Sequence, residues 1–532
     1  MPAMPRIGVF GWGIVAPKSQ NVEAFAHNLA AGGSWLEPFN GFGPDNFLVG
    51  RPKFDFHDYK AWIDARFPPG RYPQLVEKMD KPTQFAIGAF IQALGQNPGI
   101  EDELHRLGTA AHVYVGTGLG ALGTAAEASL ELHRAQRGWD RFWSEPERNS
   151  ALKTWLWKSE ADRRADPEVP LPPEMASPHE RDRAEEAWWH YWAGRSPQLH
   201  EFLAALREIE ALAVQGDVAA GKMSVMKEKE RGRKRLQREW GAPDPPWTRV
   251  TPNLLWNIHN TPSAQISMLG KIHGLAFAPV GACSTFGLTL KLALDAIHRG
   301  EAKAVVIGAA DPPPHPLTVG AFYRAKVISA DAQVSKPLTE LRGTHVSGGS
   351  AIWIVGDLEH MESKGFRPLG LEPLAVGMSS DAEHIITPSR EGPLTAIRQA
   401  FATAAVDPAE VTTWDLHATA TPGDFQEVDN LREVVPDSVL VTARKGTFGH
   451  GMGAAGGWEL TAQYLGYENG VIFPTPLAEQ ELNPQILHAH SAFAFDDACP
   501  TKPGIAGKLS MGVGGINACI LSRPFAKDGG AG

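Results

Sequence analysis

Short apolar runs alternate with helix-like stretches along most of this chain. Short, mostly apolar runs predict strands at residues 7–10, 113–115, 304–307, 351–355, 413–416, 505–509 and 518–521. Apolar residues at the spacing of one helical face predict helices at residues 23–31, 79–96, 288–298, 394–404 and 453–467. Strands that alternate with helices are typical of mainly parallel sheets with helices on their faces, so the expected fold class is α/β.

The same order of elements occurs twice, which predicts a fold of two similar halves. We expect the N-terminal half to comprise residues 1–127 and 249–311, and the C-terminal half to comprise residues 312–532. Residues 128–248 are rich in Trp and in charged residues, have Pro at their joints, and show helical periodicity with almost no strand signal. We interpret this stretch as a helical insertion in the first half.

Composition and charge narrow the class of protein. Of 532 residues, 43% are apolar and 21% charged, which is typical of a globular protein, and the net charge of −10 argues against nucleic-acid binding. The N-terminal residues lack a signal-peptide pattern, and no apolar run approaches the ~20 residues of a membrane span. Three Cys are too few for a disulfide framework and lack metal-site spacing, so we expect a cytoplasmic protein.

One of these cysteines, Cys283, lies in a turn of small residues. The turn, residues 281–287, follows an apolar run at 275–280 and precedes the helix predicted at 288–298. The N-terminus of a helix favours a thiolate, and backbone N–H groups there can hold a developing oxyanion. A lone Cys is more often a buried structural residue, so this motif alone leaves both interpretations open.

Two histidine motifs follow later in the chain. His417 lies just past a predicted strand, and the hydroxyls of Thr419 and Thr421 suit a loop that holds a ligand. His450 follows Lys445 and precedes a run of small residues at the start of a predicted helix. A satisfied hydrogen-bonding role explains His417 alone equally well. A Cys, a His, a Lys and a second His, each near the end of a strand, form a much stronger joint signal for catalysis.

Two glycine patterns match the dinucleotide-binding fingerprint. Gly11-x-Gly13-x-x-Ala16 and Gly118-x-Gly120-x-x-Gly123 both follow a predicted strand. A dinucleotide site also needs an acidic residue at the end of the next strand, about 20 residues further on, and neither pattern has one. Ordinary tight glycine turns are therefore the favoured interpretation.

Taken in order, the cysteine and histidine motifs resemble those of the β-ketoacyl-acyl-carrier-protein synthases, the decarboxylating Cys–His–His branch of the thiolase superfamily. The resemblance covers nearly everything outside 128–248, and it includes residues 79–86, 251–253, 377–388 and 510–517. It implies a thiolase-like fold of duplicated halves in a layered α-β-α-β-α core, here with the large helical insertion.

The resemblance also implies roles for individual residues. Cys283 would be the acyl-accepting nucleophile, and His417 and His450 would donate hydrogen bonds to the thioester carbonyl of the malonyl unit. Lys445 would support the His450 side electrostatically. The backbone N–H groups of Cys283 and Val513 would form the oxyanion hole for acyl transfer.

Further residues are expected to contact the substrate. Thr419 and Thr421 would hydrogen-bond the phosphopantetheine arm, and Phe286, Met511 and Val513 would line the substrate site. The substrates would be malonyl and acyl thioesters on an acyl carrier protein, with no cofactor and no metal. The family implies a homodimer, with a heterodimer as the alternative.

The implied activity is the decarboxylative Claisen condensation of a β-ketoacyl synthase, in specialised fatty acid or polyketide biosynthesis. Ala418 stands where the family has Gly, Met511 and Val513 stand where it has Phe, and residues 342–349 lack its Glu. These departures keep a non-elongating acyltransferase as an alternative. A chain-length-factor-like partner subunit is disfavoured, because such partners typically lack the nucleophilic Cys.

The insertion carries a basic run at residues 227–235. A solvated helix face is the plainer interpretation of such a run. The alternative is a docking surface for an acidic carrier protein, with association steered by charge.

Overall fold

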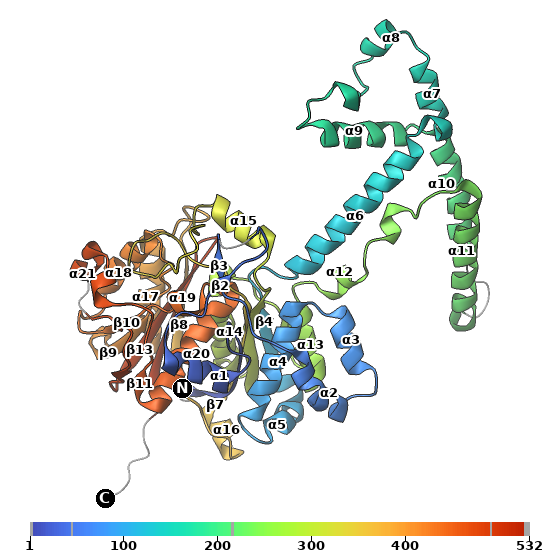
Figure 1. Ribbon diagram of the computed structural model, residues 1–532. Coiled ribbons are helices and arrows are strands. Elements are labelled where there is room, and N and C mark those ends of the chain that lie inside the picture. The colour runs from blue at the N-terminus through green and yellow to red at the C-terminus, as the bar shows by residue number, and fades with distance from the viewer. Residues whose placement is uncertain (1–3, 44–45, 214–217, 490–491, 526–532) are drawn as a thin grey trace, which may run out of the picture. The chain divides into compact units, whose positions relative to one another are not determined.

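The computed structural model describes residues 4–43, 46–213, 218–489 and 492–525 (Figure 1). The chain divides into two compact units. We call Met1–Gly123 with Leu255–Gly532 the core unit, and Thr124–Leu254 the helical unit. The stretch interpreted as an insertion, residues 128–248, falls inside the helical unit.

The first sheet of the core unit has five strands in the order β1-β7-β6-β4-β5. These are β1 (Ile7–Val15), β7 (Gly349–Asp357), β6 (Ala304–Asp311), β4 (Ala111–Gly116) and β5 (Ala276–Phe277). Strand β7 runs antiparallel to both β1 and β6, whereas β4 runs parallel to β6 and β5.

The second sheet repeats this arrangement, in the order β8-β14-β13-β9-β10. Its strands are β8 (Leu371–Ser380), β14 (Ile516–Pro524), β13 (Ile505–Gly512), β9 (Val411–Asp415) and β10 (Leu440–Thr442). Strand β14 runs antiparallel to β8 and β13, and β9 runs parallel to β13 and β10. The two sheets therefore share strand order and strand direction, as the repeated element order predicts.

Helices form three layers around the two sheets. Between the sheets lie α14 (Thr285–His298) and α20 (Ala455–Asn469), whose apolar side chains share one core with both sheets. Helices α4 (Lys81–Gly95) and α13 (Thr261–Gly270) pack on the other face of the first sheet, and α17 (Glu391–Ala404) and α18 (Gly423–Arg432) on that of the second. The predicted layered α-β-α-β-α core is confirmed (Figure 1).

Shorter elements connect these layers. They are α1 (Val22–Ala31), α2 (Lys60–Arg66), α3 (Arg71–Lys78), α5 (Ile100–Leu107), α12 (Asn253–Trp256), α15 (Pro316–Arg324), α16 (Leu358–Ser363), α19 (Lys445–Phe448), α21 (Pro484–Ala489), β2 (Glu37–Pro38), β3 (Leu48–Val49), β11 (Val471–Ile472) and β12 (Cys499–Pro500). Within the described ranges, no helix has the length and apolar character needed to cross a membrane.

The strand predicted at 351–355 belongs to the first sheet and not to the second half. As β7 it lies between β1 and β6. The first half therefore continues past residue 311, where we expected it to end, to the end of β7 at Asp357. Strand pairing is non-local, and the apolar pattern of β7 does not reveal its partners.

The glycine turn expected after residue 10 is also wrong, because β1 continues through Gly11 and Gly13 to Val15. A Cβ atom on Gly13 would lie 1.8 Å from the carbonyl oxygen of Ala89 in α4. A Cβ atom on Gly11 would lie 2.3 Å from the carbonyl oxygen of Ala93. These glycines thus let α4 pack closely against the strand, and they form no nucleotide-binding turn.

The helical unit is built from α6 (Leu122–Trp143), α7 (Ser150–Leu156), α8 (Glu160–Arg164), α9 (Arg181–Ala193), α10 (Pro197–Glu210) and α11 (Val218–Trp240). Several of its tryptophans fill two small cores of the unit itself, one around Trp139 and Trp143 and one around Trp155 and Trp192. Burying large aromatic rings is an efficient way to stabilise so small a unit.

Candidate active site

Cys283 lies in a short 3-10 turn, Ala282–Ser284, directly before α14. The Thr285 hydroxyl holds this turn, because it accepts from Gly281 N (3.0 Å) and donates to the Ala282 carbonyl oxygen (2.7 Å). Ala282 has a φ of +48°, a left-handed conformation that is strained for a residue with a Cβ atom. Such strain is common where a turn has to present a reactive side chain.

The thiol of Cys283 is only 7% exposed, and burial raises its pKa to about 11. The backbone N–H of Val513, which hydrogen-bonds the sulfur, and the positive charge of Lys445 act in the opposite direction. Burial outweighs both of these effects on the pKa of the thiol. The contact places the Val513 N–H beside the thiol, where an oxyanion-hole donor would have to lie.

His450 precedes a second turn of the same kind. This 3-10 turn, Met452–Ala454, leads into α20, and Met452 has a φ of +52°. His450 Nδ1 accepts a hydrogen bond from Met452 N (3.3 Å), which leaves Nε2 as the protonated nitrogen of the neutral ring. His450 can therefore donate one hydrogen bond to a substrate oxygen.

The two histidines lie together. The ring centroids of His417 and His450 are 5.4 Å apart, with an angle of 82° between the ring planes. Burial lowers the pKa of both rings well below 6.5, and the nearby charge of Lys445 lowers both further. Both imidazoles are thus neutral hydrogen-bond donors at physiological pH.

Asp311, at the end of β6, joins the loop of Gly118 and Leu119 to the turn that follows His450. One carboxylate oxygen accepts from Gly118 N and Leu119 N (both 2.8 Å), and the other accepts from Gly453 N (2.8 Å). A Cβ atom on Gly453 would lie 3.2 Å from the carbonyl oxygen of Ala282. The two turns are therefore in direct contact. Burial raises the pKa of Asp311 to about 6.

Five charged residues lie beneath the histidines, and we call them the buried charge cluster: Asp415, Arg444, Lys445, Glu459 and Lys508. None is more than 2% exposed. Lys445 Nζ lies 2.6 Å from Glu459 Oε1 and donates to the His417 carbonyl oxygen (2.5 Å). Lys508 Nζ lies 2.8 Å from the other Glu459 oxygen and 3.6 Å from Asp415, which also pairs with Arg444 (3.1 Å).

Lys445 was expected on the His450 side of the site, but its ammonium group is bonded to the His417 backbone. The other four members of the buried charge cluster were not predicted from the sequence as site residues. Lys508 did give a signal, since it interrupts the otherwise apolar and small residues of β13. The remaining three look like surface charges when each is seen alone.

Two carboxylates shape the loop that carries His417. Glu427 accepts from His417 N (2.6 Å) and Ala418 N (2.8 Å), and Asp424 accepts from Thr419 N (2.8 Å). Burial raises the pKa of Glu427 to about 8 and that of Asp424 to about 6. The hydroxyls of Thr419 and Thr421, 3.0 Å apart and half-buried, are held on this loop next to His417.

The residues expected to line the substrate site are distributed differently. Phe286 is fully buried in the central layer, with its ring centroid 5.2 Å from that of Trp353, and Met511 packs into the core of the second sheet. Val513 is 47% exposed, next to the thiol. Of the three, Val513 alone combines solvent exposure with a contact to Cys283.

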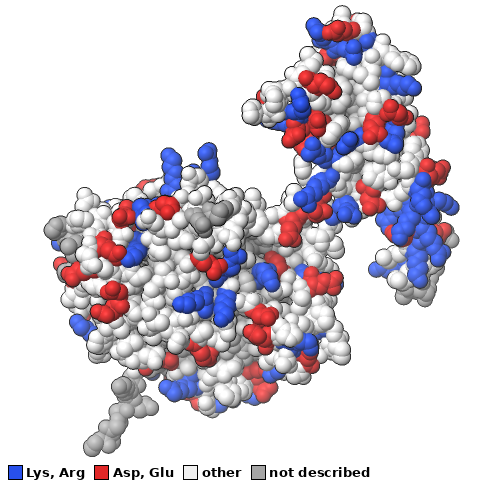
Figure 2. Space-filling view, in the orientation of Figure 1, with Lys and Arg blue, Asp and Glu red and all other residues white. Residues whose placement is uncertain are grey.

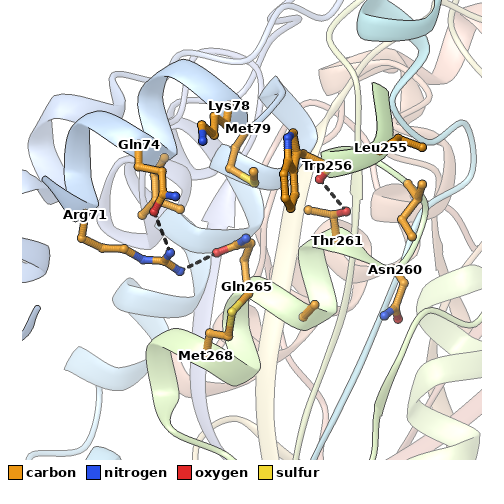
Figure 3. A pocket seen from close by; sticks show the side chains of 13 residues that line it. Arg71, Gln74, Lys78, Met79, Leu255, Trp256, Asn260, Thr261, Gln265 and Met268 are labelled. Carbon is orange, nitrogen blue, oxygen red and sulfur yellow. Dashed lines mark hydrogen bonds between the residues drawn. The ribbon is translucent and has the colours of Figure 1, made fainter. Parts of the chain in front are cut away.

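A cleft of about 290 Å³ opens between α3, α12 and α13 (Figure 3). Arg71 and Lys78 lie along it, and its apolar lining includes Leu255 and Trp256, which are 76% and 52% exposed. The Lys78 ammonium group lies 5.7 Å from the centre of the Trp256 ring. The cleft therefore combines exposed apolar surface with positive charge.

A second, smaller cleft shares the side chain of Ile258 with the first. It is also lined by Thr117 and Gly120, in the loop that Asp311 holds. Because Asp311 also binds the turn after His450, a continuous series of contacts leads from the larger cleft to the candidate active site.

Comparison with known proteins agrees with this geometry. Residues 218–360 match the family model of the β-ketoacyl synthase N-terminal domain, and residues 373–478 match that of the C-terminal domain. The chain is therefore similar to both domains of the β-ketoacyl synthases over these two ranges.

The chloroplastic 3-oxoacyl-[acyl-carrier-protein] synthase I of Arabidopsis thaliana is 28% identical over 292 residues, which cover 52% of this chain and 60% of the relative. Nodulation protein E of Rhizobium meliloti is 29% identical over 273 residues, 49% of this chain and 65% of the relative. The chain thus spans less than two thirds of the length of these relatives.

Solved structures match nearly the whole chain. The ishigamide ketosynthase/chain length factor superposes with a TM-score of 0.66 at 21% identity, covering 98% of this chain and 100% of that one. A type II polyketide synthase ketosynthase, in complex with its acyl-carrier protein, superposes with a TM-score of 0.64 at 17% identity and the same coverage. This likeness establishes the ketosynthase fold.

Proposed function

We propose that this protein is a β-ketoacyl synthase that extends a Cys-bound acyl chain with a malonyl unit. The observation that carries the proposal is the contact between the strained turn of Cys283 and the turn that follows His450. His417 lies beside His450, and both lie next to the cations of the buried charge cluster. This arrangement supplies a nucleophile and an enolate-stabilising pair side by side.

The reaction would proceed in three steps. The Cys283 sulfur, as its proton departs, attacks the acyl thioester; a new thioester forms and the carrier thiol leaves with a proton. The malonyl thioester then loses CO2, and its C–C bonding electrons become an enolate whose oxygen accepts hydrogen bonds from His417 and His450. The enolate carbon attacks the Cys283 thioester carbonyl, a C–C bond forms as the C–S bond breaks, and the Cys283 thiolate leaves and takes up a proton from solvent.

The carrier protein that delivers these substrates is proposed to dock at the cleft of Figure 3. The similar ketosynthase cited above was solved with its acyl-carrier protein. Arg71 and Lys78 suit an acidic partner, and Leu255 and Trp256 offer apolar contact.

The basic helix α11 is the competing docking surface. Eight Lys or Arg and two Glu fall between residues 222 and 238, and Figure 2 shows these cations gathered over α11. Some are paired within the helical unit, as Arg233 is with Glu210 (3.3 Å) and Glu230 (2.9 Å). Arg231 and Arg235 are exposed on α11, so its face retains positive charge.

The assembly is proposed to be a homodimer. Strand β5 lies at the edge of the first sheet, and the neighbouring Leu275 and Val280 are 55% and 52% exposed. A second copy that extends this sheet edge would cover these side chains. The three free thiols suit a reducing compartment such as the cytoplasm.

A non-elongating acyltransferase remains the second candidate function. The observation that favours it is Val513, a small and exposed residue beside the thiol that could admit an acceptor other than malonyl-carrier protein. The partner-subunit alternative is less suited to a site that contains Cys283, both histidines and Lys445.

Intact-protein mass spectrometry tests the proposed reaction. The protein is incubated with a panel of acyl-carrier proteins and then with malonyl-carrier protein, and Cys283→Ala is the control. We expect an acyl adduct that disappears on malonyl addition, with a product two carbons longer. An adduct that persists would identify the acyltransferase, and a protein that forms no adduct would contradict both catalytic roles.

Charge reversal tests the docking proposal. We expect Arg71→Glu with Lys78→Glu to weaken carrier-protein binding about tenfold or more at low salt. The matched pair Arg231→Glu with Arg235→Glu, on α11, should leave binding within about twofold. Weakening by the α11 pair, with the cleft pair unaffected, would move the docking surface to the helical unit.

A further inference from the structure

Lys508 is the one member of the buried charge cluster that lies in the middle of a sheet strand, and the proposed function assigns it no role. It occupies β13 between Gly507 and Leu509 and is fully buried. An unpaired lysine in such a position is very costly, so its surroundings should explain its presence.

The ammonium group of Lys508 joins both carboxylates of the cluster. It lies 2.8 Å from Glu459 and 3.6 Å from Asp415, and it donates to the carbonyl oxygens of Leu509 (2.5 Å) and Leu416 (3.4 Å). Leu416 immediately precedes His417, whose own carbonyl oxygen is bound by Lys445. Two lysines therefore hold consecutive carbonyl groups at the start of the His417 loop.

The charges of the cluster do not cancel. Three cations, Arg444, Lys445 and Lys508, face two carboxylates, Asp415 and Glu459. Nearby Glu427, whose pKa is raised to about 8 by burial, is mostly protonated at neutral pH and adds little negative charge. Within the five-residue cluster the cations thus outnumber the carboxylates by one, next to two neutral imidazoles.

We propose that Lys508 is a positioning residue for the decarboxylation step, holding the His417 loop and supplying the excess positive charge that stabilises the enolate. This inference rests on the proposed function and extends it to a residue that does not touch the substrate. A positive charge in a water-excluded site stabilises a developing anion far more than it would in water.

The charge also acts on the histidines. Burial is the main reason that the pKa of His417 and His450 is low, and Lys445 and Lys508 lower both further. The charged groups around Lys508 are Asp415, Glu459 and Glu427, with Arg444 and Lys445 bound to the same carboxylates and the Cys519 thiol also nearby. Asp424 on the His417 loop and Asp311 at the turn after His450, each with a pKa of about 6, titrate in the same pH range. Removing Lys508 should therefore raise the pKa of both histidines toward 6.5.

The experiment separates the two half-reactions in Lys508→Met, which removes the charge and keeps an unbranched side chain of nearly the same length. We expect CO2 release from malonyl-carrier protein to fall about tenfold, because Lys508 acts through the histidines and does not itself donate a hydrogen bond to the substrate. Acyl-adduct formation on Cys283 should stay within about twofold of wild type. The acid limb of the CO2-release profile should move to higher pH, because protonated His450 can no longer accept from Met452 N.

A charge-rescue variant distinguishes an effect of the lost charge from an effect of lost structure. Lys508→Met with Asp415→Asn again leaves one cation in excess, so CO2 release and the acid limb should return toward wild type. If Lys508→Met alone does not fold, this double variant carries the test, with the same readouts against wild type. Lys303→Met, which removes a lysine paired with Asp357 near the first sheet, is the control and should change neither half-reaction.

The inference is overturned if folded Lys508→Met keeps wild-type CO2 release and an unchanged acid limb. It is also overturned if both half-reactions fall in parallel with the melting temperature while the acid limb stays in place, or if the double variant regains stability but not CO2 release. Failure of the proposed function itself is distinguishable, since wild-type protein would then release no CO2.

Discussion

The two halves of the core unit share a backbone plan but differ in chemistry. Each has a strained residue with positive φ, Ala282 or Met452, as the first residue of a 3-10 turn that leads into a central helix. The first turn carries a thiol at Cys283, whereas the second carries Gly453 at the corresponding place. In the first half β6 is apolar up to Asp311, whereas β13 of the second half contains Lys508.

This difference suggests a division of labour between the halves. The first half presents the nucleophile, and the second provides the histidines and the buried charge that favour an anionic intermediate. Because the turns touch at Gly453 and Ala282, both contributions meet at one place. A duplicated unit can thus supply both halves of a two-step reaction once its copies differ in a few side chains.

The largest effect should come from the histidines. We expect His417→Ala or His450→Ala to reduce CO2 release from malonyl-carrier protein by about 10²- to 10³-fold, the loss typical of removing one oxyanion donor. The acyl adduct on Cys283 should still form, because it depends on the other half. Mass spectrometry and CO2 release, measured on the same samples, check this. Loss of the acyl adduct would contradict the proposed difference in chemistry between the two halves.

The contact between the turns should be the next most sensitive feature. A Cβ atom on Gly453 would lie 3.0 Å from Asp311 Oδ2 and 3.1 Å from Thr285 Cβ, so Gly453→Ala should push the turns apart. We expect both half-reactions to slow about tenfold, with a loss of stability of about 1–3 kcal/mol. Gly95→Ala, where the added methyl group meets open space, is the matched control for rates and for denaturant unfolding.

The Cys283 thiol of the first half should titrate at a much higher pH than the histidines of the second half. With a pKa of about 11, Cys283 is mostly protonated at neutral pH, and the thiolate fraction rises as pH approaches that value. Alkylation by iodoacetamide should therefore accelerate about tenfold per pH unit between pH 7 and pH 10, with Cys283→Ala as the background. A plateau above pH 8 would instead mean that the helix N-terminus stabilises the thiolate.

The smallest effect is expected at the loop hydroxyls. Thr421→Val removes the partner of Thr419 and one hydroxyl near His417. We expect KM for carrier-bound substrates to rise about fivefold with kcat unchanged, the value of one hydrogen bond. Thioesters that lack the pantetheine arm should be unaffected, and an equal loss with both substrate types would argue against a role in binding that arm.

Much of the fold follows from local patterns. Helices α1, α4, α14, α17 and α20 begin and end within three residues of the predicted ranges, because each has a long apolar face. The two-residue strand β5 is too short to predict as a separate element. The Gly11 and Gly13 pair reads locally as a turn, although its cause is the close approach of α4, which only tertiary structure reveals.

The site was partly predictable for a similar reason. Cys283, His417 and His450 could be found because each lies in a distinctive run of small or polar residues near a strand end. Asp415 and Glu459 could not, since a buried carboxylate looks like a surface carboxylate until its partner is known. Lys508 lies 93 residues from Asp415 in sequence, and only the fold brings their charged groups to 3.6 Å.

The measurement that tests the division of labour most directly is CO2 release from malonyl-carrier protein by Cys283→Ala with no acyl donor present. The account predicts that CO2 release persists within about tenfold of wild type, because the histidines and the buried charge cluster remain intact. No condensation product should form. A folded Cys283→Ala protein that no longer releases CO2 would contradict the account, since decarboxylation would then depend on the first half as well.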